Sequence, residues 1–575
     1  MLARMFERIG GLKGALWGGL ALSAVLALGV LIGAWATSSG LKDRILAALR
    51  GSQASQERQI DLREQTATWR PIASNLHDLE AATIQLAPFR TNGRGGAIDE
   101  IAGGVIFASP LGEVGYLSAA GELQHIDLEV PLNADALRQS PISQTPGFIE
   151  LMFRVLDLLV VDRGEGAYDL YVSHHRFAGD CFQIVVSRAA LRLEDGVLRA
   201  ASPDWSTLFT ARPCVPPKPT GMVFEGNESG GRMVLRDART MLLSLGDLQF
   251  NGVDDTQTYA QDPNVDLGKI VAIDLQDGRS RIVSSGHRNP QGLLVARNGL
   301  IWSTEHGPQG GDEINVIRQG ADYGWPTVTY GMHYSYGGAR RDWPNNPAQG
   351  RHDGFAQPAF AFVPSISISN LVEPDPREFP LWRDTLLIGS LYTSRQLYLA
   401  RTEGDRIAYV ETLTIDNVAR DIISLSDGRI AILTDNGQLI LLRNAERRSP
   451  DNTTLTVRAS QSVLDYVAAH PAPARSASVA AAEAFTFSCS SCHSLSGVAG
   501  VGPPLDGVIG RRVGAYPGFD YSQAMANSEE TWTRERLARF LENPDAQYPG
   551  TRMPRQWVTR EDAEAIAGFL ANDDD

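Results

Sequence analysis

The sequence predicts a mainly β protein, built as a β-propeller, with an N-terminal transmembrane helix and a small C-terminal all-α domain. Three observations lead to this prediction. Residues 1–40 hold a long apolar run behind basic residues, residues 76–446 alternate short apolar runs with turn residues, and residues 481–575 change to helical periods. At 575 residues the chain is also too long for a single core, so several folded units are expected.

The N-terminal segment has the pattern of a membrane anchor. Arg4, Arg8 and Lys13 precede an uncharged run of 23 residues, 14–36, which at about 1.5 Å per residue covers the roughly 30 Å hydrocarbon core. Because a basic flank stays cytoplasmic, the pattern predicts a single-pass protein of the bacterial inner membrane with its bulk in the periplasm. A cleaved signal peptide is the alternative, since Ala34–Ala36 resembles a cleavage site.

The strand-rich region repeats one scheme, an apolar strand, a tight polar turn and a second apolar strand. About six such hairpins fill 76–446, and a β-propeller accounts for them better than a sandwich does. Four of them pair 104–107 with 114–117, 232–235 with 241–245, 292–295 with 300–303, and 422–425 with 430–433.

Two segments flank this region. Residues 41–75 are polar and amphipathic and predict a helical stalk. Residues 447–480 include an Ala/Ser/Pro-rich stretch and predict a linker to the last domain.

Charge and cysteines restrict the function further. The chain carries 52 Lys and Arg against 67 Asp and Glu, a net charge of -15, which disfavours nucleic acid as a partner. Four cysteines are present, and two belong to the motif described next. In an exported protein the remaining Cys181 and Cys214 favour a disulfide, with two buried thiols as the alternative.

Residues 489–493 read Cys-Ser-Ser-Cys-His, the C-x-x-C-H pattern of covalent haem attachment. Two thiols one turn apart reach the haem vinyl groups, and the adjoining His493 reaches the iron. Without that histidine, Cys489 and Cys492 would also suit a redox dithiol or half a zinc site. The second axial ligand is expected on a separate segment, and Met553 in a Pro-Gly-rich loop is the candidate, with Met525 as its competitor.

Residues 485–571 resemble a class I cytochrome c. The resemblance rests on the haem motif and on the segments 502–505, 518–522 and Trp532. It implies one covalent haem c, with the Pro503 carbonyl bonded to the ligand histidine. It also implies that segment 518–522 and Trp532 hold the propionates. Ordinary core packing is the alternative reading for these aromatic residues.

Two segments of the strand region are dense in polar residues and glycine, 286–292 and 305–315, the latter followed by 322–326. Arg288 offers a bidentate fork and Asn289 a directed amide, which together suit an anionic, carbonyl-rich ligand. Turn glycines with solvated charges are the alternative.

The second of these segments also offers oxygen ligands. The backbone carbonyls of Gly307 and Pro308 suit a hard cation. Asp312 and Glu313 are candidates for a second, structural Ca²⁺.

Residues 220–445 resemble the glucose/sorbosone dehydrogenase family, whose members are six-bladed propellers that use pyrroloquinoline quinone and Ca²⁺. The resemblance rests on 286–292, on 305–315 and on Tyr-Gly-Trp-Pro at 323–326. It implies that Arg288 and Asn289 contact the quinone, that the Gly307 and Pro308 carbonyls bind Ca²⁺, and that Asp247 orients the catalytic base.

The sequence departs from the family at three positions. Glu228 stands where the family has its general-base histidine. Tyr392 replaces a quinone-binding lysine. Of two family arginines spaced two apart, Val418 takes one position and Arg420 remains. A buried glutamate can serve as the base, whereas the lost cations weaken the hold on a tricarboxylate.

Two functions follow. The first is a membrane-anchored quinohaemoprotein that oxidises a sugar or alcohol, with Glu228 as base aided by Asp247 and with Arg288 polarising the quinone. It would pass electrons through the haem to a respiratory acceptor. The second is a propeller that has lost its cofactor and binds a ligand or partner, tethered to a working cytochrome.

Overall fold

The computed structural model describes the chain from residue 63 onward, with gaps. The described residues are 63–86, 89, 95–139, 153–216, 226–252, 257–308, 310–332, 351–391, 395–415, 417–448, 452–470, 485, 489, 493, 495, 502–553, 558 and 560–571. The predicted membrane run 14–36 lies outside them, so that prediction is untested. Within these ranges no helix combines the length and the apolar character needed to cross a membrane.

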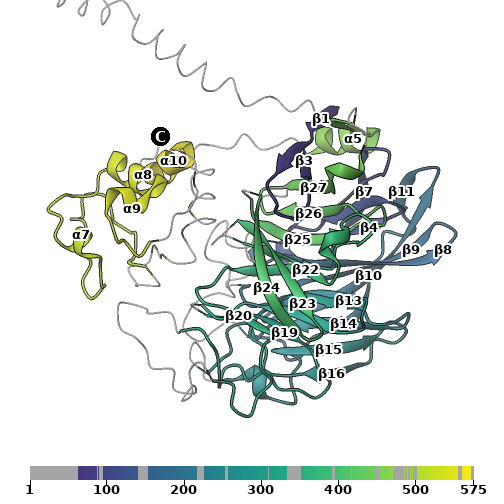
Figure 1. The fold of residues 1–575 in the computed structure, drawn as a ribbon, viewed down its shortest axis with the longest axis horizontal. Coiled ribbons are helices and arrows are strands. Elements are labelled where there is room, and N and C mark those ends of the chain that lie inside the picture. Colours follow the sequence, from purple (N-terminus) through teal and green to yellow (C-terminus); the bar gives the residue numbers. More distant parts are fainter. Residues whose placement is uncertain are drawn as a thin grey trace, which may run out of the picture. The chain divides into compact units, whose positions relative to one another are not determined.

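The described strands form six sheets, the blades of a propeller (Figure 1). Blades 3, 4 and 5 are four-stranded sheets. Blade 3 holds β13 (Gly230–Leu235), β14 (Thr240–Leu245), β15 (Lys269–Asp274) and β16 (Ser280–Ser284), and blade 4 holds β17 (Pro290–Val295), β18 (Ile301–Glu305), β19 (Asp312–Val316) and β20 (Phe360–Phe362). Blade 5 holds β21 (Ile368–Val372), β22 (Thr385–Ser390), β23 (Gln396–Glu403) and β24 (Arg406–Thr414). The first strand of each blade contacts the first strand of the next, and blade 6 returns to blade 1. The predicted six-bladed, mainly β fold is confirmed.

The other three blades carry additional strands. Blade 1 holds β4 (Ala97–Ile101), β5 (Gly104–Ala108), β6 (Glu113–Leu117), β7 (Glu122–Glu129), β28 (Thr454–Ala459) and β1 (Glu64–Thr68). Blade 2 holds β8 (Val155–Gly164), β9 (Ala167–Phe177), β10 (Phe182–Glu194), β11 (Val197–Ala200) and β12 (Ser206–Thr210). Blade 6 holds β25 (Ala419–Ser424), β26 (Ile430–Thr434), β27 (Gln438–Asn444), β3 (Leu79–Gln85) and β2 (Arg70–Ile72).

Blade 6 closes the ring by combining the two ends of the propeller sequence. Strand β3 pairs antiparallel with β27, from Leu79 opposite Asn444 to Gln85 opposite Gln438. In Figure 1 the purple early strand therefore lies beside the green late ones. Closure of this kind leaves neither end of the ring with an unpaired blade.

The four hairpins read from the sequence are all present, as the pairs β5–β6, β13–β14, β17–β18 and β25–β26. Their residues are largely buried on both faces because each blade packs between two others.

A ring of polar contacts joins each blade to the next. In every case a buried or partly buried side chain bonds to the backbone of the neighbouring first strand. The six bonds are Val160 N to Asp99 Oδ2 (2.7 Å), Met233 N to Asp157 Oδ2 (2.6 Å), Ser244 Oγ to Pro290 O (2.9 Å), Thr304 Oγ1 to Ser369 O (2.5 Å), Ser369 Oγ to Ala419 O (2.6 Å) and Ile98 N to Asp421 Oδ2 (2.9 Å). At about 1 kcal/mol each, such bonds fix the blades' mutual register and satisfy buried backbone groups.

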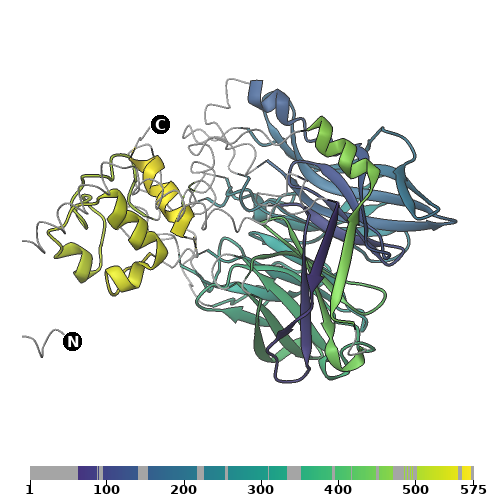
Figure 2. The same ribbon diagram turned by 90° about the horizontal axis from the view of Figure 1, so that it is seen from above.

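Two segment predictions need correction. The predicted helical stalk 41–75 is wrong over 64–72, because these residues are the strands β1 and β2. The predicted linker 447–480 is wrong over 454–469, where β28 pairs with β1 and β7 and the helix α5 (Gln461–Ala469) follows. Figure 2 shows the purple β1 lying along the light green β28. Composition misled here because β1, β2 and β28 are short strands with many polar residues.

The helix α5 is part of the propeller through its side chains. Its Tyr466 hydroxyl donates to the Glu113 carboxylate, and the Tyr466 ring stacks on His125 at 4.2 Å between centroids. Short elements elsewhere are α3 (Ala134–Gln139) and the 3₁₀ turns η2 (Tyr259–Gln261), η4 (Pro380–Trp382) and η5 (Ala445–Arg447).

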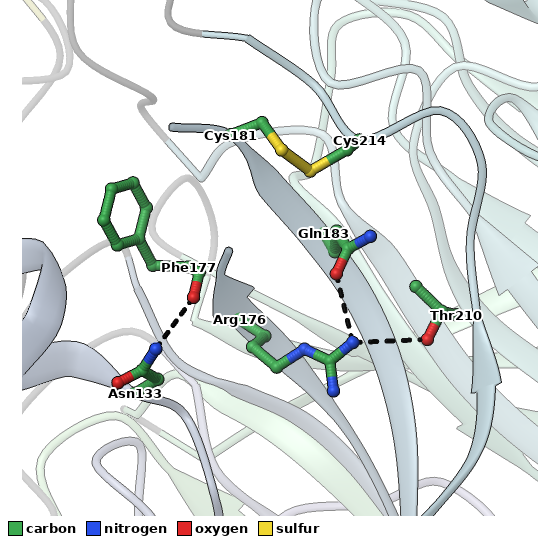
Figure 3. Close-up of a disulfide and its surroundings, with 7 residues drawn as sticks. All are labelled: Asn133, Arg176, Phe177, Cys181, Gln183, Thr210 and Cys214. Carbon is green, nitrogen blue, oxygen red and sulfur yellow. Dashed lines mark hydrogen bonds between the residues drawn. A yellow bond between two sulfur atoms is a disulfide. The ribbon is translucent and has the colours of Figure 1, made fainter. Parts of the chain in front are cut away.

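The predicted disulfide between Cys181 and Cys214 is confirmed, with 5.6 Å between the Cα atoms. It ties the turn before β10 to the segment after β12 (Figure 3). Next to it, Arg176 Nη2 donates to Gln183 Oε1 at 3.1 Å and to Thr210 Oγ1 at 3.4 Å. The bridge therefore reinforces an edge that these polar contacts already hold.

The C-terminal domain is helical, as predicted. Its described helices are α7 (Gln523–Ala526), α8 (Arg534–Glu542), α9 (Pro544–Gln547) and α10 (Arg560–Leu570). Helices α8 and α10 pack together, and a Cβ on Gly568 would come within 2.9 Å of the Arg534 guanidinium. One hydrophobic cluster, which includes Cys489 and Trp532, forms the core.

Candidate functional site

Arg288 and Asn289 lie in the turn that leads into β17, the first strand of blade 4. A Cβ on Gly286 would meet Asp322 Oδ1 at 2.1 Å, so the turn requires glycine there. The Glu305 carboxylate, at the end of β18, accepts from the Arg288 backbone N–H and lies 2.9 Å from His287 Nδ1. Glu305 therefore fixes where the Arg288 side chain begins.

The Arg288 guanidinium is buried and engaged on two sides. Nη2 donates to Glu228 Oε1 in an ion pair whose two side chains are each 8% exposed. Nη1 donates to the carbonyls of His306 (3.2 Å) and Gly307 (2.9 Å). Cζ lies 5.3 Å from the centroid of the Trp325 ring, within cation–π range. Three residues of the motif segments and Glu228 thus converge on one cation.

Glu228 is held in a strained backbone. Its φ is 56°, and those of Leu248 and Gln249 are 52° and 67°, the left-handed region that non-glycine residues rarely adopt. The two segments cross closely, because a Cβ on Gly246 would lie 1.9 Å from the Glu228 carbonyl oxygen. Strain concentrated around one carboxylate points to a functional site rather than to a relaxed turn.

Asp247 lies between these two strained segments and is fully buried. Its carboxyl accepts from Trp325 Nε1 at 2.6 Å and from Gln249 N at 2.9 Å. Burial raises the pKa of Asp247, while Glu228, the bond to Trp325 and the charge of Arg288 act in the opposite direction. Glu228 thus acts on the pKa of Asp247, and the role of Asp247 in orienting the base stays a prediction.

Asn289 faces the same region from the other side. Its Oδ1 accepts from Gly230 N at 3.3 Å and from Gln291 Nε2 at 2.7 Å. With its Oδ1 used by these two donors, Asn289 has its Nδ2 as the group that suits a ligand that accepts hydrogen bonds.

The loop that begins at Gly307 is crowded with carbonyl oxygens. A Cβ on Gly307 would lie 2.3 Å from Gly310 O and 2.4 Å from Gly311 O. Hard oxygen donors suit Ca²⁺, and an arginine fork and an amide suit a carboxylated quinone, so the residues fit both groups in kind. The Gly307 carbonyl is nevertheless the one that Arg288 already contacts.

The predicted second calcium site is not supported. Asp312 Oδ2 accepts from Ser365 Oγ, Ile366 N and Ile368 N, and its Oδ1 accepts from Gly307 N. Glu313 is likewise occupied by Asn315 and His352. Among the described residues no cluster of three or more His, Cys, Asp or Glu is placed to hold a metal. Asp312 instead joins blade 4 to the segment that enters blade 5.

Arg420, predicted to contact the quinone, forms a buried two-pronged ion pair with Asp435, with distances of 2.6 and 2.7 Å. Its backbone carbonyl accepts from Arg232, whose Nη1 lies 2.7 Å from both Asp157 and Asp421. Each of the three arginines thus faces a carboxylate. A trianionic ligand has to compete with these pairings.

Among the positions where the sequence departs from the family, Val418 is buried and apolar, and Tyr392 lies outside the described residues.

Burial lowers the pKa of His306, and the charges of Arg288 and Arg420 lower it further. Both arginines therefore act on the same histidine.

Sequence reasoning gave no role to Glu305, Trp325 or Arg232. All three stand inside the segments that it quoted, so the signal was present. Their roles depend on partners from other blades, such as Asp247 for Trp325, and those pairings are not readable from one segment.

In the C-terminal domain, His493 Nδ1 lies 2.7 Å from the Pro503 carbonyl oxygen, as the resemblance implied. The bond fixes the ring and leaves Nε2 for the iron. A Cβ on Gly502 would lie 2.3 Å from His493 Cε1, so the loop closes tightly on the imidazole. Cys489 is buried in the domain core, and Cys492 lies outside the described residues. These residues fit a covalent haem.

The two methionines have different surroundings. Met525 is buried on α7, and its sulfur accepts from Thr551 Oγ1 at 3.5 Å. Met553 is half-buried against the edge of the same cluster. A core position for Met525 favours Met553 as the second axial ligand, which stays a prediction.

Comparisons with known proteins divide the chain at the same place. Residues 155–443 match the family described as Glucose / Sorbosone dehydrogenase, and residues 478–573 match Cytochrome c. An uncharacterized protein of Synechocystis sp. is 32% identical over 263 residues, which are 42% of this chain and 60% of that protein. Aldose sugar dehydrogenase YliI of Escherichia coli is 29% identical over 273 residues, 44% of this chain and 67% of that protein.

The C-terminal domain has its own relatives. Cytochrome c-type cyt cy of Rhodobacter capsulatus is 44% identical over 88 residues, 15% of this chain and 44% of that protein.

A solved glucose dehydrogenase structure is 25% identical to the chain, with a TM-score of 0.49, over 63% of this chain and 98% of that one.

The family match covers half of the chain and includes every residue of the propeller site. The chain spans 60% and 67% of the lengths of its first two relatives. The chain belongs to the glucose/sorbosone dehydrogenase family and carries a cytochrome c domain fused after its propeller.

Proposed function

We propose that the propeller oxidises a sugar or alcohol with pyrroloquinoline quinone and Ca²⁺ and passes the electrons to the covalent haem c. The observation that carries this proposal is the position of the Arg288 guanidinium, which contacts both the Glu228 carboxylate and the Gly307 carbonyl, next to Asn289. A relative named aldose sugar dehydrogenase supports the class of reaction.

The chain's own residues have distinct roles in this proposal. Glu228, aided by Asp247, accepts the proton of the substrate hydroxyl. Arg288 and Asn289 bind the quinone, and the carbonyls of Gly307 and Pro308 bind Ca²⁺. Arg420, fixed by Asp435, contributes positive charge beside them. The quinone, when bound, supplies the carbonyl that accepts hydride.

The haem domain serves as the outlet for the electrons. His493 and Met553 hold the iron, and a thioether ligand raises its reduction potential, which suits an acceptor. Fusion to the propeller makes the transfer intramolecular and so replaces diffusion by a high effective concentration. The final acceptor in this proposal is a respiratory carrier.

The location follows from the N-terminal segment. Residues 14–36 anchor the chain in the bacterial inner membrane, with the propeller and haem domain in the periplasm. The disulfide is consistent with an oxidising compartment.

Reconstitution tests the proposal. The purified chain is loaded with pyrroloquinoline quinone and Ca²⁺, and sugars and alcohols are screened while the haem absorbance is followed. Haem reduction that needs both quinone and substrate is the expected result. Absence of quinone binding at micromolar concentrations contradicts it.

A second function is favoured by one observation, the pairing of Arg288 and Arg420 with buried carboxylates. A propeller without quinone would bind a ligand or partner and leave the cytochrome to work alone. In the same reconstitution this reading predicts a haem that chemical reductants reduce and that no sugar reduces.

A further inference from the structure

His175 lies on β9 of blade 2, is fully buried, and reaches the turn formed by residues 226–231 where blade 3 begins. Its Nε2 lies 2.8 Å from the Ser229 hydroxyl oxygen. Two residues earlier on the same face of β9, Ser173 Oγ donates to the Gly231 carbonyl at 2.6 Å. One face of β9 therefore contacts this turn at two points.

The hydrogen bonds of His175 fix its tautomer. The Arg154 backbone N–H donates to Nδ1 at 3.2 Å, so Nδ1 carries no hydrogen and the ring proton lies on Nε2. Nε2 therefore donates to Ser229 Oγ, and the Ser229 hydroxyl donates to the Gly226 carbonyl at 2.9 Å. The backbone of His175 is anchored as well, because its N–H donates to the Arg154 carbonyl at 3.0 Å. A relay of three hydrogen bonds thus runs in one direction, from Arg154 to Gly226.

The far end of this relay spans Glu228. Glu228 has a φ of 56°, and Gly226 and Gly230 on either side of it have φ values of 60° and 63°. Glycine adopts this left-handed region freely, whereas a glutamate there is strained, and such strain persists only where the surrounding contacts impose it. The bond from Ser229 to Gly226 closes the turn around Glu228, and His175 directs the Ser229 hydrogen into that bond.

We infer that His175 is a positioning residue of the propeller site, which acts through Ser229 to hold the turn that sets where the Glu228 carboxylate lies. The catalytic part of this inference rests on the proposed function, in which Glu228 accepts the substrate proton. The carboxylate itself is paired with Arg288, from the turn before β17. Without the hold of His175 on the backbone, the carboxylate follows the guanidinium and loses its place relative to the substrate hydroxyl.

Two amide replacements separate the two ring nitrogens of His175. In His175→Asn the side-chain oxygen reaches the position of Nδ1 and keeps the bond from Arg154, and the amide does not reach Ser229. In His175→Gln the amide nitrogen reaches the position of Nε2 and donates to Ser229. His174→Asn is the matched control, because His174 is equally buried and lies on the opposite face of β9, with Nε2 2.8 Å from Ser187 Oγ in blade 2.

Hydrogen exchange of the full chain, without added quinone or calcium, tests the hold on the turn. In His175→Asn the amides of residues 226–232 should exchange about tenfold faster than in the wild type, as expected for one lost buried hydrogen bond. His175→Gln and His174→Asn should exchange there at the rate of the wild type. An unchanged rate in His175→Asn refutes the inference, whether or not the chain binds quinone.

Turnover of the reconstituted chain tests the catalytic consequence. His175→Asn should lower kcat about 100-fold with KM unchanged, because the base is misplaced while the groups that bind the substrate are not. His175→Gln should restore most of kcat. Equal losses in the two variants, or the same loss in His174→Asn, would make His175 a structural residue of blade 2 and overturn the inference. If the wild type shows no turnover, the proposed function has failed, and the exchange result alone decides whether His175 holds the turn.

Discussion

The two cofactor regions of this chain differ in how their key side chains are held. In the haem domain, His493 is oriented by Pro503, ten residues away, and its second nitrogen is left for a ligand. In the propeller, Arg288 is paired with Glu228, sixty residues away, and contacts the Gly307 carbonyl as well. The haem site is preorganised for its cofactor, whereas the charged side chain of Arg288 in the propeller site is already paired with other groups of the protein.

This difference has an energetic meaning. Haem ligation at His493 breaks no described contact, whereas quinone binding at Arg288 must exchange a buried ion pair for new charge-assisted bonds. Each such bond is worth about 1.5–3 kcal/mol, so the exchange is close to neutral unless the ligand offers several. Affinity for the quinone is therefore where this chain is expected to differ from a propeller with free cations.

The largest expected effect is at Arg288. Replacing it by Ala should lower the rate of quinone-dependent haem reduction about 100- to 1,000-fold, because two charge-assisted contacts to the ligand are lost. Stopped-flow absorbance of the haem measures the rate. Arg281→Ala, on the exposed face of β16, is the control and should leave the rate unchanged. Equal rates in both variants would remove Arg288 from the site.

Arg420 comes next and tests whether its pairing with Asp435 is structural. Replacing Arg420 by Met leaves a buried carboxylate unpaired and should destabilise the propeller by about 3–5 kcal/mol. Scanning calorimetry of the propeller transition measures the loss. The double variant Arg420→Met with Asp435→Leu should recover most of it. A single variant that is fully stable yet binds quinone poorly would show that Arg420 serves the ligand instead.

The two methionines of the haem domain separate ligation from packing. Met553→Ala should abolish the iron–thioether absorption and lower the reduction potential, with little loss of fold. Met525→Ala should keep the absorption and destabilise the domain by about 2–3 kcal/mol, as expected for a buried methionine. Visible spectra and thermal unfolding of both variants give the answer. Interchanged outcomes would make Met525 the ligand.

The smallest effect concerns Asp99, whose carboxylate accepts from Val160 N and so joins blade 1 to blade 2. Burial, together with the carboxyls of Asp157 and Asp421, raises the pKa of Asp99 to about 7. The folded state then binds the proton more tightly than the unfolded chain, so this contribution is complete below pH 4 and is lost as the pH rises through 7.

From pH 5 to pH 8 the propeller should therefore lose about 1–3 kcal/mol through Asp99. Thermal unfolding of the wild type and of Asp99→Asn at both pH values isolates this part. The variant should show the smaller pH dependence. If the two proteins change in parallel, Asp99 does not titrate in this range.

The fold was largely predictable because its signals are local. Hairpins such as 232–245 alternate apolar strands with polar turns, and the C-x-x-C-H motif is contiguous. The strands β1 and β28 were missed, since short strands with many polar residues resemble a stalk or a linker in composition. Their pairing joins residues such as Glu64 and Arg458, and no sequence period records so distant a contact.

The site was predictable in its members and not in its charge balance. Motif density identified Arg288, Asn289 and Gly307. The saturation of Asp312 by backbone N–H groups and the pairing of Arg232 with Asp157 and Asp421 depend on how several blades meet. The hydrogen bonds of Asp312 to the segment before β21 do not support the calcium role predicted for it.

Stopped-flow measurement tests whether electrons pass from substrate to haem within one chain. The full chain, loaded with pyrroloquinoline quinone and Ca²⁺, is mixed with an oxidisable sugar, and the haem absorbance is followed at several protein concentrations. Intramolecular transfer predicts a first-order haem reduction whose rate constant does not depend on protein concentration. No reduction, or a rate constant that rises in proportion to protein concentration, would contradict it.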